Sequence, residues 1–164
     1  MARIRMRRLV LILCCAALVV PALYSQQGSS APAALSDDGL RQMLTAMGYE
    51  PKPLSKGYLL AIKRDTWTLN VQVVLSDNKQ KIGMNANVGL VENPDAVTAT
   101  QWRSLLIANG DIDPSFFYYD ATTKKLFLHR VLDNTGLTAA MLRSQIDSFC
   151  ENIKNTENLW KFTK

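Results

Sequence analysis

Histidine and cysteine are scarce in this chain, and their scarcity excludes several kinds of site. The 164 residues include one His and three Cys, and Cys14 and Cys15 lie inside an apolar run near the N-terminus. Beyond that run, only His129 and Cys150 are left. Ordinary zinc sites need several His or Cys ligands, so we expect no metal site. A single Cys forms no internal disulfide, and packing must therefore stabilise the fold.

Sequence motifs of catalysis and of phosphate binding are also missing. The sequence has no G-x-S-x-G element, no Gly-rich loop before a helix and no EF-hand spacing. A nucleophilic pair of Cys150 and His129 would need Cys150 in a polar cleft, but this Cys adjoins Phe149 and Ile146 on the apolar side of a predicted helix. We therefore expect Cys150 in the core, no catalytic residue and no cofactor. An enzyme with a carboxylate-based site ranks last among the hypotheses.

The N-terminus has the pattern of a secretory signal. Four Arg in the first eight residues precede an apolar run over residues 9–23, and small and polar residues follow. This pattern predicts a signal peptide over residues 1–25, cut after Ser25, with a later cut within SSAPAA as the alternative. The protein is then periplasmic or secreted. The apolar run is shorter than the roughly 20 residues of a membrane span, so retention of residues 9–23 as a membrane anchor is the alternative location.

The basic charge of the chain comes mostly from this N-terminal segment. The whole chain has 19 Lys and Arg against 14 Asp and Glu, a net charge of +5. Removal of residues 1–25 takes away four Arg and no acid, which leaves 15 basic against 14 acidic residues and a net charge of +1. A near-neutral domain lacks the basic footprint of nucleic-acid binding, and we expect no nucleic-acid partner.

Helix caps and apolar spacing predict three helices. The first runs from Ser36 to Gly48, the second begins with a capping box at Thr98 and ends at Gly110, and the third begins at Thr138. The side chains expected on the inner sides of the second and third helices are Trp102, Leu105, Leu106, Asn109, Leu142, Ile146, Phe149, Ile153 and Trp160. Residues 26–35, QQGSSAPAAL, are small and polar with one Pro, which predicts a flexible lead-in. A single domain is predicted to follow over residues 36–164.

Alternation of apolar and polar residues predicts five strands, over residues 58–64, 67–75, 81–90, 116–120 and 124–131. The segment between the first helix and the first strand contains two Pro and is predicted to be a connector. Antiparallel hairpins interrupted by helices are typical of an α+β domain. The sequence therefore predicts a five-stranded antiparallel sheet with helices packed on one face, in the order α-βββ-α-ββ-α.

Three segments carry a resemblance to a known family: TQWRSLLIANGDID, FFYYDATTKKLFLHRVL and GLTAAMLRSQIDSF. In the second segment, Phe117 and Asp120 followed by Leu126 and Leu128 fit an F-x-x-D strand, a turn and an L-x-L strand. The chain resembles the type III secretion chaperone-like fold and the YbjN-type proteins of bacteria over roughly residues 36–160. The resemblance implies a protein-binding module, often a homodimer, without catalytic activity.

The second side of the hairpin over residues 67–90 is unusually rich in neutral polar side chains. The candidate binding residues on it are Thr68, Asn70, Gln72, Asn85 and Asn87. Two interpretations fit: a face that is simply solvated, as antiparallel sheets allow, or a contact surface for a partner or a polar ligand. Amides are poor strand formers, and the near absence of charge is unusual for a solvated face. These two details point to the second interpretation, but the solvated face stays the leading one.

A run of four aromatic residues, Phe116 to Tyr119, places rings on both faces of one strand. Either Phe117 and Tyr119 or the other pair enters the core, and the remaining rings cover the sheet or form a docking surface. The leading hypothesis is an exported, non-enzymatic protein-interaction module with an unknown protein partner, a second copy of the chain included. The alternative is an extracytoplasmic domain that binds a small molecule or a glycan through the amides and these aromatics.

Overall fold

The computed structural model describes residues 34–163 of the chain. The predicted signal peptide, residues 1–25, and residues 26–33 of the predicted lead-in lie outside the described residues. The elements are α1 (Asp37–Ala46), β1 (Lys52–Pro53), β2 (Tyr58–Arg64), β3 (Trp67–Leu75), β4 (Lys81–Leu90), the 3-10 helix η1 (Pro94–Ala96), α2 (Ala99–Asp111), β5 (Ser115–Asp120), β6 (Lys125–Asp133), α3 (Ala139–Asn155) and α4 (Glu157–Trp160).

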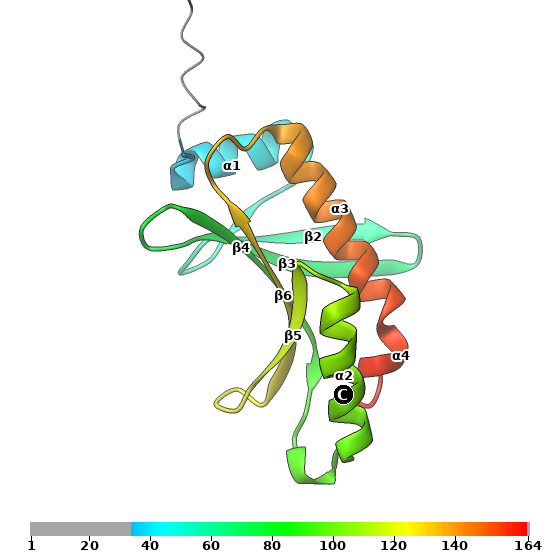
Figure 1. Ribbon diagram of the computed structural model, residues 1–164. Coiled ribbons are helices and arrows are strands. Elements are labelled where there is room, and N and C mark those ends of the chain that lie inside the picture. The colour runs from blue at the N-terminus through cyan, green and yellow to red at the C-terminus, as the bar shows by residue number, and fades with distance from the viewer. Residues whose placement is uncertain (1–33, 164) are drawn as a thin grey trace, which may run out of the picture.

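The strands form one antiparallel sheet of six strands in the order β1-β2-β3-β4-β6-β5. The pairing of β4 with β6 joins the two hairpins, and the sheet twists strongly along its width (Figure 1). The predicted α+β class and antiparallel sheet are confirmed, but the strand number is corrected from five to six. The extra strand, β1, lies in the segment predicted as a connector and pairs Pro53 with Tyr58. Pro is tolerated there because β1 is an edge strand.

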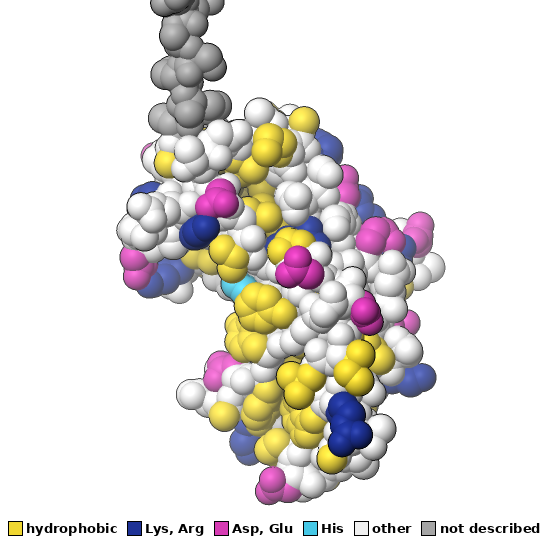
Figure 2. Space-filling model, in the orientation of Figure 1, with side chains coloured by type: hydrophobic (Ala, Val, Ile, Leu, Met, Phe, Trp, Pro, Cys, Tyr) yellow, Lys and Arg dark blue, Asp and Glu magenta, His cyan; other side chains and the backbone are white. Residues whose placement is uncertain are grey.

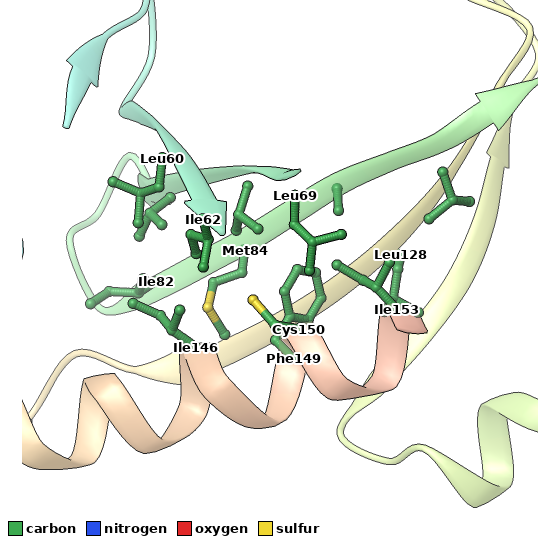
Figure 3. Packing of buried hydrophobic residues seen from close by; sticks show 14 of the residues in the cluster. Leu60, Ile62, Leu69, Ile82, Met84, Leu128, Ile146, Phe149, Cys150 and Ile153 are labelled. Carbon is green, nitrogen blue, oxygen red and sulfur yellow. The ribbon is translucent and has the colours of Figure 1, made fainter. Parts of the chain in front are cut away.

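The helices cover one face of this sheet, and the core lies between α3 and the strands. Figure 3 shows Ile146, Phe149 and Cys150 of α3 directed toward strand residues such as Met84 and Leu128. All five of these side chains are buried. Because successive strand residues point to opposite faces, the other face of each strand has no helical cover from the described residues, 34–163.

The predicted helix starts are confirmed in their caps. Ser36 caps α1 by accepting a hydrogen bond from the Gly39 N–H. Thr98 and Gln101 form the reciprocal capping box of α2, and the Thr138 side chain accepts from the Met141 N–H at the start of α3. These bonds are local, since each joins residues three apart, and that is why sequence spacing predicts them.

The C-terminal helix differs from its prediction, because it does not continue unbroken to Trp160. The chain leaves α3 after Asn155, and the Thr156 hydroxyl donates to the Asn152 carbonyl at 2.6 Å. The short helix α4 then starts in a new direction and brings Trp160 to an edge-to-face contact with Trp67, with ring centroids 6.1 Å apart. Within residues 34–163, no helix has both the length and the apolar character to cross a membrane.

A buried arginine ties α3 to the sheet. Arg130 of β6 is 2% exposed, and its guanidinium donates to neutral oxygens: Ser115 Oγ at 2.8 Å, Gln145 Oε1 at 2.9 Å and Ser148 Oγ at 3.2 Å. A buried charge is tolerated only when its donors are satisfied. This cluster therefore fixes where α3 crosses the sheet, and with it which strand face stays uncovered.

Candidate functional site

Two surfaces of the domain have a composition that suggests binding, and the first is the sheet face opposite α3. We name it the open face. Its central side chains are Thr68, Asn70, Gln72, Gly83, Asn85, Asn87, Phe116, Tyr118, Phe127, His129 and Val131. The five residues predicted from the sequence as binding residues all lie on this face, and the strand pairing brings Gln72 opposite Asn85. Their function in binding stays a prediction.

Three of the predicted amides are held by bonds within the chain. Gln72 Nε2 donates to the Lys56 carbonyl at 2.9 Å. Asn87 Oδ1 accepts from the Gly89 N–H at 3.1 Å, and Asn85 Oδ1 lies 2.5 Å from His129 Nδ1. Because a carbonyl oxygen can only accept, the His129 Nδ1 must carry the proton in this pair. The amide groups are therefore oriented rather than freely rotating.

Aromatic rings extend the open face beyond the amides. Phe116 and Tyr118 are 39% and 38% exposed, whereas Phe117 is buried toward the helices. Tyr118 stacks on Phe127 with centroids 5.2 Å apart, and burial raises the pKa of Tyr118, with a smaller contribution from the Asp120 charge. The structure thus decides the question that the sequence leaves open, since Phe117 and Tyr119 face the helices and the other two rings face out.

His129 lies where the amides and the aromatic rings meet. Its strand pairing sets it opposite Asn85 and Phe116, and the Phe116 ring meets it edge-on at 5.1 Å. Gly83 leaves room for the imidazole, because a Cβ there would lie 3.3 Å from the ring. Burial lowers the pKa of His129 below its usual 6.5, partly offset by a hydrogen bond with the Met84 backbone. Figure 2 shows the histidine, in cyan, in a hollow beside hydrophobic side chains.

The second surface is the outer side of α2, and it corrects a sequence prediction. Leu105 is buried as predicted, but Leu106 is 70% exposed and Ile107 is 63% exposed. The prediction of Leu106 on the inner stripe is wrong because Leu105 and Ala108 face the sheet, and Leu106 lies about 100° further round the helix. We name Leu106, Ile107 and the adjoining pocket the α2 surface.

A pocket with a volume of about 310 Å³ lies between α2 and β5, and Leu106 is one of its lining residues. Its lining consists of Trp102, Leu105, Leu106, Asn109, Phe117, Tyr118, Tyr119 and Leu126. Figure 2 shows hydrophobic side chains gathered over α2 and β5. Large exposed apolar areas on a small domain commonly mark a contact surface.

At this pocket, the Asn109 side chain hydrogen-bonds to the backbone at the outer edge of β5. Its Oδ1 accepts from the Phe117 N–H at 2.7 Å, and its Nδ2 donates to the Phe117 carbonyl at 3.3 Å. The side chain thus makes the two bonds that a neighbouring strand would make to β5, which is an edge strand. A partner at this surface must therefore pack on side chains near Phe117 rather than extend the sheet there.

The two residues considered as a nucleophilic pair, Cys150 and His129, do not lie together in the structure. Cys150 is buried in the core, and burial raises the pKa of its thiol to about 11, which leaves it protonated and unreactive at neutral pH. His129 lies on the opposite face of the sheet, so the two cannot form a nucleophilic pair. Among residues 34–163, His, Cys, Asp and Glu form no group of three or more that could hold a metal ion.

With this geometry, the chain can be compared with known proteins. No family model and no curated protein matches it. Among solved structures, the ExsC–ExsE complex matches with a TM-score of 0.56 at 16% identity, covering 78% of this chain and 97% of the other. YbjN from E. coli matches with a TM-score of 0.57 at 20% identity, covering 74% and 89%.

A third structure, the HopA1–SchA chaperone–effector complex, matches with a TM-score of 0.51 at 9% identity, covering 74% of this chain and 89% of the other. Identities this low establish the fold alone. The resemblance predicted from the sequence, to the secretion chaperone-like fold and to YbjN, is therefore confirmed at the level of the fold.

Sequence reasoning missed Leu106 and Ile107 as surface residues. It grouped the amides with the aromatics of Phe116 to Tyr119 in one hypothesis, but it did not include Phe127 or His129 in that group. The first could have been found from the helix itself, because apolar side chains occur around most of α2 and exceed what one buried stripe needs. The second could not, because the pairing of β4 with β6 joins segments about 45 residues apart in the chain.

Proposed function

We propose that the protein is an exported, non-enzymatic protein-interaction module that binds its partner through the α2 surface. The observation that carries this proposal is the exposure of two adjacent large aliphatic side chains, Leu106 at 70% and Ile107 at 63%, beside an apolar pocket. Water contact with such side chains is unfavourable, and burying each one in an interface releases on the order of 1–2 kcal/mol.

A second copy of the chain is the partner we place there. The α2 surface carries few charges, so two copies can meet without strong like-charge repulsion, and a two-fold axis would bring Leu106 and Ile107 against the pocket of the other copy. The Asn109 bonds to Phe117 leave side-chain packing as the way to associate at that position. Export is supported by the Arg-rich, apolar pattern of residues 1–25.

Two of the structures with this fold are complexes of two different proteins, ExsC with ExsE and HopA1 with SchA. They support an interaction function in general terms and identify no partner for this chain. A different protein on the α2 surface is accordingly the alternative occupant.

The test is the solution mass of the protein, purified from cells that express the whole reading frame, measured by light scattering over a concentration series. We expect a dimer for the wild type and a monomer for Leu106→Lys. Met141→Lys is the matched control, since Met141 is 53% exposed at the start of α3, and it should remain a dimer. Mass spectrometry of the same preparation should give Gln26 as the N-terminal residue.

Three results would each contradict a part of the proposal. A wild type that stays monomeric at every concentration removes the second copy as the occupant. A dimer that survives both Leu106→Lys and Ile107→Lys shows that the contact is elsewhere. A full-length mass, with residues 1–25 retained, would replace cleavage with anchoring.

A further inference from the structure

The open face presents an uncharged array of hydrogen-bonding groups whose orientation is set from within the chain. The oxygens of Asn85 and Asn87 accept bonds from His129 and from the Gly89 N–H, so the amide NH₂ groups of both residues are turned outward as donors. Gln72 is fixed the other way, because its NH₂ group donates to the Lys56 carbonyl and its oxygen is left as an acceptor. Oriented groups lose little entropy when a ligand binds.

Donors and acceptors alternate across the two central strands. Gln72 of β3 lies directly opposite Asn85 of β4, so an acceptor and a donor are neighbours about 5 Å apart. Asn70 and Thr68 continue the row on β3, and within residues 34–163 their side chains form no hydrogen bond. A ligand on this face therefore meets both kinds of group within a short distance.

An aromatic platform adjoins this array. Asn87 is paired with Phe127 on the neighbouring strand, and Phe127 stacks with Tyr118. Phe116 is tilted against Tyr118 at 6.5 Å and completes the platform. Because these rings contact one another, they leave no cage for a cation between them, and they offer an exposed apolar surface beside Asn87.

Charged groups lie at the margins of the face. Lys63 is next to Thr68 at one end of β3, and Lys81 at the start of β4 is paired with Asp133 at 2.5 Å. Between these ends the amides and the rings carry no charge, since His129 is neutral at physiological pH and the Tyr118 phenol is protonated. An ionic ligand would lose hydration here without gaining an ion pair.

We propose that the open face binds a neutral oligosaccharide across its strands, with the apolar side of one sugar ring against Phe116 and Tyr118 and the hydroxyls of the following rings bonded to Asn85, Asn87 and Gln72. A hydroxyl both donates and accepts, so one ligand group satisfies either kind of amide atom. The C–H side of a pyranose suits the electron-rich face of an aromatic ring. An open face, unlike a closed pocket, allows a chain to continue beyond the contact.

This site shares Tyr118 with the pocket of the α2 surface but no other residue, and its test is separate. The purified full chain is titrated by calorimetry with cellotetraose, maltotetraose, mannotetraose and chitotetraose, and with a heparin fragment as the charged probe. We expect at least one neutral tetrasaccharide to bind and the heparin fragment not to bind. Tyr118→Ala should weaken the binding about tenfold, which corresponds to one lost aromatic contact, and Asn87→Ala should weaken it several-fold.

Met141→Lys is the matched control, because Met141 is exposed at the start of α3 and lies outside both the open face and the pocket that Tyr118 lines, so this variant should bind the sugar as the wild type does. Near-ultraviolet circular dichroism checks that each variant is folded. Binding of the heparin fragment alone, absence of binding to any of the neutral sugars, or sugar binding unchanged in both Tyr118→Ala and Asn87→Ala would overturn the proposal. Selection from a peptide library of Tyr118-dependent peptides, with no sugar binding, would assign the open face to a protein instead.

Discussion

The two sides of β4 are made from the same ten residues and meet opposite environments. Ile82, Met84 and Ala86 are buried under α3, whereas Asn85 and Asn87 between them lie on the open face. The apolar side tolerates little change, because its side chains are packed on all sides. Within residues 34–163 no helix packs on the amide side, so its composition is less constrained by packing and can serve binding.

Helix α2 also has one buried side and one exposed side. Leu105 and Leu106 are neighbours of identical chemistry, yet one is 3% exposed and the other 70%. On β4 the uncovered side is polar, as expected for a surface in water, but on α2 the uncovered side is aliphatic. The difference teaches that the open face can be stable in water alone, whereas the α2 surface gains free energy when another chain covers it.

The largest expected effect comes from truncating these two leucines separately. Leu105→Ala should lower the free energy of unfolding by about 2–5 kcal/mol, because it opens a cavity in the core. Leu106→Ala should change it by less than about 0.5 kcal/mol when measured by urea denaturation of the monomer at low protein concentration. Equal losses for the two variants at that concentration would show that Leu106 is covered within the monomer.

A smaller effect is expected on lowering the pH, and it arises on the open face. The folded pKa of His129 is lowered by burial, so below pH 6.5 the unfolded chain takes up a proton more readily than the folded one. Stability should therefore be complete above pH 6.5 and fall as the pH drops below it, with a slope of at most about 1.4 kcal/mol per pH unit. Urea denaturation between pH 5 and pH 7.5 measures this slope.

His129→Gln is the control for that experiment, since it removes the chain's single His and keeps a polar side chain opposite Asn85. The variant should lose the pH dependence in this range. If its stability falls with pH as steeply as that of the wild type, another group is responsible, and the lowered pKa of His129 is not the cause.

The smallest expected effect tests whether the amides are kept at a cost to the sheet. Asn is a poor strand former and Thr a good one, so Asn70→Thr should raise the free energy of unfolding by up to about 1 kcal/mol. Lys63→Thr, at the margin of the same face, is the comparison, with an expected change of a few tenths of a kcal/mol. A loss of stability in Asn70→Thr would mean that the amide supports the fold.

Much of the fold was predictable because its signals are local. The capping box of Thr98 with Gln101 and the N-caps at Ser36 and Thr138 each involve residues three apart, and the strand bounds of β2, β3 and β4 follow from simple alternation. The short strand β1 was missed because two residues are too few for a periodic pattern, and the break at Thr156 was missed because apolar spacing continues past it.

The candidate binding residues were predictable only in part. Alternation places Asn70, Gln72, Asn85 and Asn87 on one side of a hairpin, because strand side chains have a period of two whatever the rest of the chain does. That side chains such as Tyr118 and Phe127 would extend the same face depended on the register of β4 with β6. A register of this kind is set by burial and not by neighbours in the sequence.

By itself, the sequence determined which residues share a strand or a helix and which of them are apolar, because periodicity and capping act over a few residues. Only the tertiary structure decided which sides of those elements are covered. Leu106 and Cys150 are both apolar positions on helices, but α3 lies across the sheet and buries Cys150, while nothing in residues 34–163 covers Leu106. Burial depends on which distant segments of the chain pack together, and a local sequence pattern does not contain that information.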